Sequence, residues 1–257
     1  VFLVSSSADV SSRVERKGLR IIEDLRLESV GLRVLRVAVP AGRPEQSVID
    51  VLQAADPRGL VSFNHVYSPA GVSSAATKTS RAALNAKRMS GKIGLVDAGV
   101  DARHPMLRDV SVTTRPFGTA SQQVDQHGTA VASRIAEAAP GASILAANVF
   151  TRMPGGEEIA SADAIARGMD WLAQMKVPVI NLSLAGPANP ILESMAVRLI
   201  AKGHVLVAAV GNEGPQAPPQ YPAAYDNVVG VTAVDTKHRV YLYANQGAYV
   251  DFAAPGV

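Results

Sequence analysis

A short apolar strand that ends on an acidic residue constrains the fold of this chain more than any other feature. Residues 93–96 are apolar, with a β-branched residue at each end, and Asp97, Ala98 and Gly99 follow them directly. This pattern is typical of a buried strand followed by a turn. Because open α/β sheets bind ligands at the carboxyl ends of their strands, Asp97 is a candidate functional residue. Asp is also common in ordinary turns, so this position alone does not establish a function.

Strands and helices alternate along the rest of the chain. Near-continuous apolar runs, typical of parallel strands covered on both faces, occupy residues 144–149, 177–184, 204–210 and 227–234. Two apolar stripes with helical spacing lie among them: Ile159, Ala162, Ile165, Met169 and Leu172, then Leu192, Met195, Ala196, Leu199 and Ile200. The alternation predicts an α/β fold, a parallel sheet with flanking helices and a site at the carboxyl ends of the strands.

The first 70 residues have a different pattern, which predicts a small α+β domain of their own. Its expected order is β-α-β-β-α-β, the ferredoxin-like or split βαβ arrangement. The expected strands begin at residues 2, 19, 32 and 59, the last running to 67, and the expected helices cover 7–17 and 44–55. Residues 71–91 are rich in small and polar side chains and are interpreted as a linker, with a short surface helix over 75–88. The larger domain is then 92–257.

Composition excludes several classes of function. The chain has 257 residues, of which 47% are hydrophobic, and this is typical of globular domains. With a net charge of +3, no long basic block and 5% aromatic residues, a nucleic-acid partner is not expected. No apolar run approaches the ~20 residues that span a bilayer. The absence of cysteine excludes thiolate catalysis and Cys-ligated zinc, but leaves the compartment open.

Three further segments carry polar residues where chemistry is expected. His127 begins a run of small residues that reads as a helix start, with Gly128 allowing close approach of another segment. Asn212 follows Gly211 at the end of an apolar strand, and its amide is the type of donor that stabilises an oxyanion. Residues 180–187 end a further strand whose edge can pair with an extended peptide. Each has an ordinary structural reading by itself, as a helix end, a turn or a strand edge.

Together, and in this order, these segments resemble the motifs of the subtilisin-like (S8) serine peptidases. The resemblance rests on Val-Asp-Ala-Gly-Val-Asp around Asp97, His-Gly-Thr-Ala-Val-Ala from His127, Asn-Leu-Ser-Leu-Ala-Gly-Pro from Asn181, and Ala-Val-Gly-Asn-Glu-Gly around Asn212. It extends over residues 92–257 and includes Asp-Phe-Ala-Ala-Pro-Gly-Val at 251–257. The first 70 residues are similar in pattern to the ferredoxin-like (I9-like) propeptide of the same family.

The resemblance implies roles for seven residues. Asp97 would orient and charge-stabilise His127, which would act as general base and then as general acid. Asn212 would hold the oxyanion, while the substrate backbone would bind along Ser183, Leu184, Ala185 and Gly211. Residues 1–70 would act as an intramolecular inhibitor. The expected partners are a peptide or protein substrate and this propeptide, and the expected location is secreted or periplasmic.

The chain departs from the family pattern in two places that matter. The family's Gly-Thr-Ser motif with the nucleophile is expected beyond Val257, so the 257 residues alone are expected to be inactive. Met106 stands where many members have a calcium-binding Asp; a thioether is a poor calcium ligand, and no metal or other cofactor is expected. The alternative to a peptidase precursor is a catalytically inactive pseudopeptidase that binds peptides or serves as a scaffold. A dinucleotide-binding enzyme is disfavoured because no Gly-x-Gly-x-x-Gly follows residues 93–96.

Overall fold

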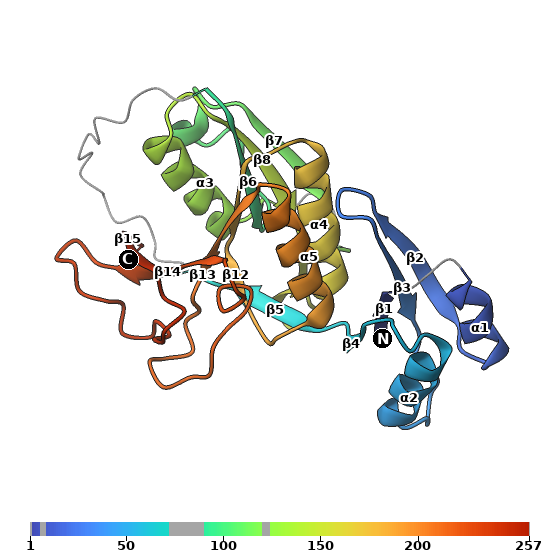
Figure 1. The fold of residues 1–257 in the computed structure, drawn as a ribbon. Coiled ribbons are helices and arrows are strands. Elements are labelled where there is room, and N and C mark those ends of the chain that lie inside the picture. Colours follow the sequence, from blue (N-terminus) through green and yellow to red (C-terminus); the bar gives the residue numbers. More distant parts are fainter. Residues whose placement is uncertain (1, 6–8, 72–89, 120–123, 257) are drawn as a thin grey trace.

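A seven-stranded parallel sheet forms the centre of the larger part of the chain in the computed structural model, which describes residues 2–5, 9–71, 90–119 and 124–256 (Figure 1). Every neighbouring pair in this sheet is parallel. Its spatial order is β15 (Phe252–Pro255), β14 (Val229–Val234), β13 (Val205–Ala209), β11 (Val179–Leu182), β6 (Lys92–Asp97), β8 (Ser143–Asn148) and β7 (Val112–Pro116). The predicted α/β fold with a parallel sheet is confirmed.

Helices cover both faces of this sheet. Helix α3 (Gln126–Ala138) lies on one face, while α4 (Ala162–Gln174) and α5 (Pro190–Ala201) lie on the other (Figure 1). Alternate residues of β6 point to opposite sides. Leu95 therefore belongs to the hydrophobic cluster under α3, and Val96 to the larger cluster under α4 and α5. A short 3-10 helix, η1 (Pro105–Leu107), follows the loop after β6.

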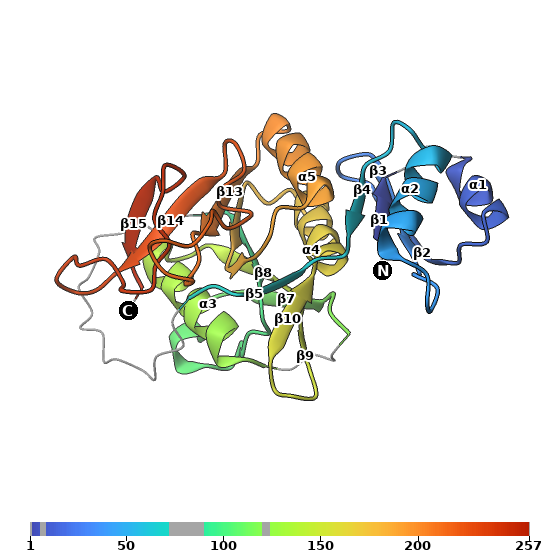
Figure 2. The same cartoon turned by 90° about the horizontal axis from the view of Figure 1, so that it is seen from below.

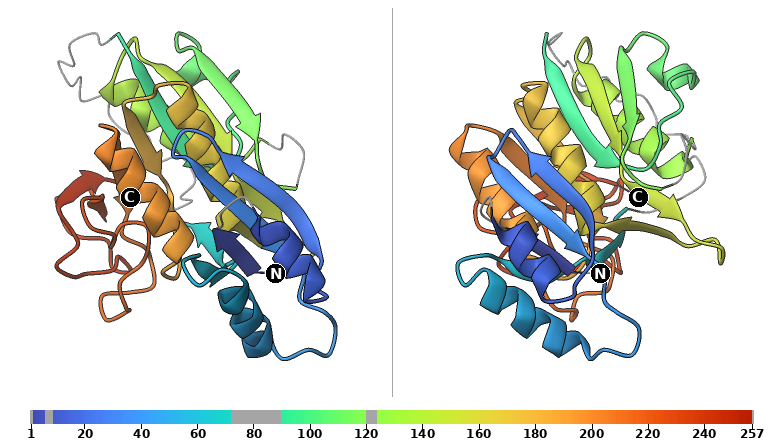
Figure 3. Two further views of the ribbon diagram at one scale, coloured as in Figure 1. Left: turned by 45° about the vertical axis from the view of Figure 1, so that its right-hand side comes forward. Right: turned by 90° about the vertical axis from the view of Figure 1, so that its right-hand side faces the viewer.

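The N-terminal part forms a separate antiparallel sheet with the order β2-β3-β1-β4. Its elements are β1 (Phe2–Ser5), α1 (Val10–Arg16), β2 (Ile21–Leu27), β3 (Leu32–Val37), α2 (Glu45–Ala55) and β4 (Val61–Phe63). The two helices share one cluster with buried residues of β3. Apolar residues of β2 and β3 on the opposite face, among them Leu27 and Val34, join the cluster that contains α4. The small sheet thus lies between its own helices and α4 (Figure 3).

A third sheet joins the two parts of the chain, and its order is β12-β5-β10-β9. Strand β5 (Val66–Pro69) follows the N-terminal sheet directly and runs alongside the larger part (Figure 2). It pairs antiparallel with β12 (Leu184–Ala185) on one side and with β10 (Glu158–Ser161) on the other. Strand β9 (Phe150–Arg152) completes the sheet. A segment from the N-terminal part is therefore held between two strands of the larger part.

Two expectations for individual elements are wrong. The strand expected over residues 59–67 is two strands, β4 and β5, which belong to different sheets. Ile159, expected on a helix, lies in β10, because its strand pairs with β5 and β9 and α4 begins only at Ala162. The surface helix expected over 75–88 lies outside the described residues.

Among the described helices, none has the length and apolar character needed to cross a bilayer.

Candidate active site

Asp97 and His127 lie side by side at the carboxyl end of β6. The Nδ1 atom of His127 is 2.7 Å from Oδ1 of Asp97, and the carboxylate is completely buried. The same Oδ1 accepts a hydrogen bond from the amide of Ala98, 2.6 Å away. A carboxylate fixed in this way holds the imidazole with its other nitrogen, Nε2, directed away from β6. The two residues are 30 positions apart in the chain and meet as the sequence motifs predict.

The start of α3 fixes the position of His127. Asp125 is the N-cap residue, and its Oδ1 accepts a hydrogen bond from the amide of His127, 2.6 Å away. Gly128 packs directly against the turn after β6, because a Cβ placed there would lie 2.4 Å from the carbonyl oxygen of Ala98. Only glycine permits this approach. The helix start therefore brings the imidazole onto Asp97, as expected for Gly128 from the sequence.

The surroundings of His127 favour its protonated form. Burial is the largest single influence and lowers the pKa of the imidazole, while the hydrogen bond and charge of Asp97 and the charge of Asp125 raise it. The backbone carbonyl of Ala70 lies close enough to the ring to contribute in the same direction. The net effect raises the pKa of His127 above its ordinary value. An imidazole with a carboxylate behind it is suited to taking up a proton at Nε2.

Strands β12 and β10 flank β5 beside this pair, and the space between them, which β5 occupies, is called the groove. The carbonyl of Ser183 accepts a hydrogen bond from the amide of Ala70, 3.1 Å away. Leu184 pairs with Pro69, and Ala185 pairs with Ser68. Three of the predicted substrate-binding residues, Ser183, Leu184 and Ala185, thus contact an extended segment of the protein itself.

Asn212 lies at the other side of the same segment. Its Nδ2 atom donates a hydrogen bond to the carbonyl oxygen of Gly71, 3.1 Å away. Gly211 precedes it with a φ of +101°, which favours glycine, and its carbonyl accepts a hydrogen bond from Asn245. Gly71 also faces His127, since a Cβ placed on it would lie 2.6 Å from Nε2. The structure therefore brings His127, Asn212 and β12 around the backbone of residues 68–71.

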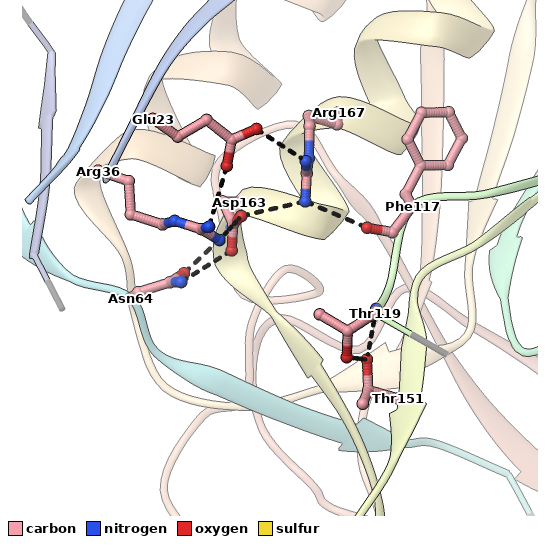
Figure 4. A network of polar contacts seen from close by, with 8 residues as sticks. All are labelled: Glu23, Arg36, Asn64, Phe117, Thr119, Thr151, Asp163 and Arg167. Atoms are coloured by element: carbon pink, nitrogen blue, oxygen red, sulfur yellow. Dashed lines mark hydrogen bonds and ion pairs between the residues drawn. The ribbon is translucent and has the colours of Figure 1, made fainter. Parts of the chain in front are cut away.

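A polar network that no local sequence pattern indicates joins the N-terminal part to α4 (Figure 4). The side chain of Asp163, in the first turn of α4, is completely buried and lies 2.9 Å from Arg36 and 3.1 Å from Arg167. Asn64 bonds to Asp163 through both its amide nitrogen and its oxygen. Glu23 lies 3.1 Å from each of the two arginines. The only sequence signal was an acidic residue in a helix first turn, which is usually exposed.

Tyr67 is another residue whose role is not indicated by its local sequence. It lies in β5 and is 1% exposed, although it follows the partly exposed His65 and the exposed Val66. Its hydroxyl donates a hydrogen bond to the carbonyl of Pro187, 2.8 Å away. Its burial depends on strands far away in the sequence, and no local pattern indicates it.

Within the described ranges, no group of three or more His, Asp or Glu residues is placed to hold a metal ion.

Comparison with known sequences identifies relatives of the larger part of the chain. The profile of the Subtilase family matches residues 90–257. Subtilisin DY of Bacillus licheniformis is 33% identical over 180 residues, which are 65% of this chain and 64% of that protein. Thermitase of Thermoactinomyces vulgaris is 36% identical over 179 residues, which are 64% of this chain and 62% of that protein. The chain therefore spans slightly less than two thirds of these relatives.

Solved structures show the same fold. Fervidolysin of Fervidobacterium pennivorans, a keratinolytic enzyme related to subtilisin, superposes with a TM-score of 0.76 over 100% of this chain and 47% of its own. At 20% identity this likeness concerns the fold alone, but it includes the N-terminal part. The subtilisin-like protease Apa1 of the Antarctic psychrotroph Pseudoalteromonas sp. AS-11 is 27% identical, with a TM-score of 0.57, over 65% of this chain and 41% of its own. With its profile match, its relatives and its fold in agreement, this chain belongs to the Subtilase family.

Proposed function

We propose that this chain is part of the precursor of a secreted subtilisin-like serine endopeptidase. The observation that carries the proposal is the buried hydrogen bond of 2.7 Å between Asp97 and His127, beside a bound backbone at Ala70 and Gly71. An imidazole supported by a carboxylate and facing a peptide is the arrangement that activates a nucleophile. A relative named minor extracellular protease Epr, from Bacillus subtilis (strain 168), supports secretion.

In this proposal each polar residue has one role in peptide hydrolysis. His127 takes the proton of a serine hydroxyl as the oxygen attacks the peptide carbonyl, and then gives a proton to the leaving amine. Asp97 holds the imidazole in the required tautomer and stabilises the imidazolium. Asn212 donates its amide hydrogen to the oxyanion. The serine belongs to a part of the protein outside these 257 residues.

Residues 1–70 are proposed to be the propeptide that inhibits the enzyme within the same chain. Support comes from β5, which pairs with β12 and β10 as an added strand and leads to Gly71 at His127 and Asn212. A substrate bound along β12 would use the same backbone positions. While β5 is bound, the groove is closed to other peptides.

The proposal is tested with the full-length protein and a fluorophosphonate probe, which reacts with activated serines. Labelling is expected in the wild type after removal of the N-terminal part. His127→Ala is expected to lower the labelling rate by several orders of magnitude. His204→Ala is the matched control, because His204 contacts the carbonyl of Val177 away from the site, and it should label normally. Equal labelling of the His127→Ala and wild-type proteins would exclude His127 as the base.

A peptide-binding pseudopeptidase is the second candidate. The observation that favours it is that β5 pairs with a strand on each side, β10 and β12. Binding a peptide by backbone pairing alone needs no catalytic serine. Such a protein would bind extended peptides after displacement of β5 but would not react with the probe. A full-length sequence without the Gly-Thr-Ser motif would support this candidate, whereas a Gly-Thr-Ser motif with probe labelling would exclude it.

A further inference from the structure

We propose that Asn245 is a positioning residue for Asn212, to which the proposed function assigns the oxyanion. The inference rests on that function and deepens it, because Asn245 lies outside the motifs that supply the active-site residues. It belongs to the loop between β14 and β15, and it is completely buried. A buried amide side chain needs hydrogen-bond partners for its polar atoms. Those of Asn245 lie in the loop that carries Asn212.

Asn245 holds the two peptide groups on either side of Asn212. Its backbone amide donates a hydrogen bond to the carbonyl oxygen of Gly211, 3.1 Å away. Its side-chain Oδ1 accepts a hydrogen bond from the amide of Glu213, 2.8 Å away. Because each peptide group is planar, fixing the two that flank a residue fixes its φ and ψ. The direction in which the Asn212 side chain leaves the backbone is therefore set by Asn245.

The side chain of Asn245 can take only one orientation. While Oδ1 faces the amide of Glu213, Nδ2 donates to the carbonyl oxygen of Pro218 at 3.3 Å. Turning the amide group over would place a donor against the N–H of Glu213 and an acceptor against the carbonyl of Pro218. An aspartate at this position would likewise bring an oxygen against the Pro218 carbonyl. The pair of bonds thus specifies an asparagine.

Two glycines let the loop and the segment that contains Asn245 come together. Gly211 has a φ of +101°, and a Cβ placed on it would lie 3.2 Å from Oδ1 of Asn245. The amide of Gly214, which has the same φ, donates a hydrogen bond to the carbonyl of Tyr243, 2.9 Å away. Asn212 lies within the part of the loop that these contacts hold.

The position of the Asn212 side chain matters most in the transition state. Its Nδ2 lies 3.1 Å from the carbonyl oxygen of Gly71, and in the proposed reaction it donates to the oxygen that becomes negatively charged. Removing such a donor lowers kcat by about 100-fold or more, and a donor that points in a wrong direction loses part of this effect. We therefore expect the loss of Asn245 to lower kcat on the order of 10-fold and to leave KM nearly unchanged.

The first test uses the full-length enzyme after removal of the N-terminal part. Its substrate is the nitroanilide of Tyr-Ser-Pro-Ala, which copies residues 67–70. Asn245→Ala should lower kcat on the order of 10-fold, and Asn212→Ala about 100-fold. In the double variant Asn245→Ala should have no further effect, because the residue that it positions is gone. A fall in kcat by the same factor in both backgrounds would indicate a merely structural role and would overturn the proposal.

Gln220→Ala is the matched control for Asn245→Ala. The Nε2 atom of Gln220 also donates to the carbonyl of Pro218, at 3.2 Å, but this bond involves neither peptide group beside Asn212. Its kcat should stay within about twofold of the wild type, and a loss as large as that in Asn245→Ala would contradict the proposal. If Asn245→Ala does not fold, the same comparison is made with Asn245→Asp, which has the same size and disturbs the bond to Pro218.

The second test uses the chain with β5 in place and needs no enzymatic activity. Hydrogen exchange of the Ala70 amide reports how firmly the end of β5 is held, because this amide donates to Ser183 and the next residue, Gly71, is bound by Asn212. Asn212→Ala should accelerate this exchange about fivefold, the effect of one ordinary hydrogen bond. Asn245→Ala should accelerate it by a similar factor, but not in the Asn212→Ala background.

The two tests separate the failure of this inference from that of the proposed function. If the wild-type enzyme does not cleave the nitroanilide, the proposed enzymatic function fails, and the exchange measurement still decides the role of Asn245. Unchanged exchange of the Ala70 amide in Asn245→Ala, or equal acceleration with and without Asn212, would overturn the inference.

Discussion

Gly71 lies so close to His127 that a Cβ on Gly71 would be 2.6 Å from the Nε2 atom of the imidazole. Gly71 also has a φ of +152°, which side chains other than that of glycine rarely tolerate. The backbone that follows β5 can reach Asn212 only because this residue has no side chain. The contact makes the occupation of the site by the protein's own segment sensitive to a single methyl group.

Gly71→Ala is therefore expected to displace the end of β5 from the site. The clash should cost about 2 kcal/mol, within the range for overpacked positions, and accelerate exchange of the Ala70 amide about 30-fold. Gly31→Ala is the control, because Gly31 also has a positive φ, +65°, but has no neighbouring atom within 4 Å of its added Cβ. Unchanged protection of Ala70 in Gly71→Ala would contradict the described contact with His127.

The pKa of His127 should fall in Asp97→Asn. Without the carboxylate charge the effect of burial dominates, so the pKa is expected to move from above to below its ordinary value of 6.5. In the wild type the raised pKa stabilises the folded protein. This contribution is complete below about pH 6.5 and is lost as the pH rises through the pKa of the folded state. NMR titration of the imidazole checks the shift, with Asp109→Asn, an exposed aspartate, as the control.

Asp125 has two effects that substitution can separate. Asp125→Asn keeps an oxygen to cap α3 but removes the charge, so the pKa of His127 should fall while the free energy of unfolding changes little. Asp125→Ala removes the cap as well and should lower the free energy of unfolding by about 1 kcal/mol. Urea denaturation and imidazole titration of both variants distinguish the two. A pKa of His127 that stays at its wild-type value, together with a lower free energy of unfolding in Asp125→Asn, would contradict this assignment.

Removing the carboxylate of Asp163 should loosen the attachment of the N-terminal part. Asp163→Ala leaves Arg36 and Arg167 with Glu23 as their remaining acid and is expected to cost about 3 kcal/mol. Fluorescence of Trp171 in α4, the single tryptophan of the chain, monitors unfolding in urea. Glu137→Ala, which breaks an exposed ion pair with Arg134, should cost less than about 1 kcal/mol. Equal effects of the two substitutions would argue against the importance of the buried network.

The same network predicts a response to acid. Burial raises the pKa of Asp163, but hydrogen bonds, including the one from Asn64, and the charges of Arg167 and Arg36 lower it by more, and the net pKa is below 3.8. The stabilisation is therefore present above about pH 3.8 and is lost as the pH falls through the lower pKa of the folded state. Trp171 fluorescence between pH 5 and about pH 2 should show this loss in the wild type and a smaller one in Asp163→Asn.

Much of the central sheet was predictable because each of its buried strands is marked by a short apolar run in its own sequence. Residues 93–96 and 205–210 are apolar on both faces of their strands, which is the pattern of strands under two layers of helices. The approach of His127 to Asp97 was also predictable, since helix starts and strand ends meet at one edge of a parallel sheet. Here Gly128 gave a further signal, because a helix that starts close to another backbone needs a residue without a side chain.

The remaining features depend on partners far away in the sequence. Strand β5 was read as the end of the preceding strand, because its pairing partners, β10 and β12, come about 90 or more residues later. Ile159 was read as helical for the same reason. Strand β7 is an edge strand with mostly polar or exposed residues and gave no apolar run. The contacts of Asp163 and Tyr67 arise only when the N-terminal part lies on α4 and the groove.

The contacts of residues 64–67 form an unbroken series along residues 160–163. Asn64 bonds to Asp163, His65 accepts from the amide of Ala162, and Val66 and Tyr67 pair with the next two residues back along the chain. Hydrogen bonds that follow one another along two segments break one after another, starting from the end of the series that is released first. The N-terminal part would thus dissociate in steps. After cleavage of the chain near Gly71, the hydrogen bonds between Asn64 and Asp163 would be the last of the series to break.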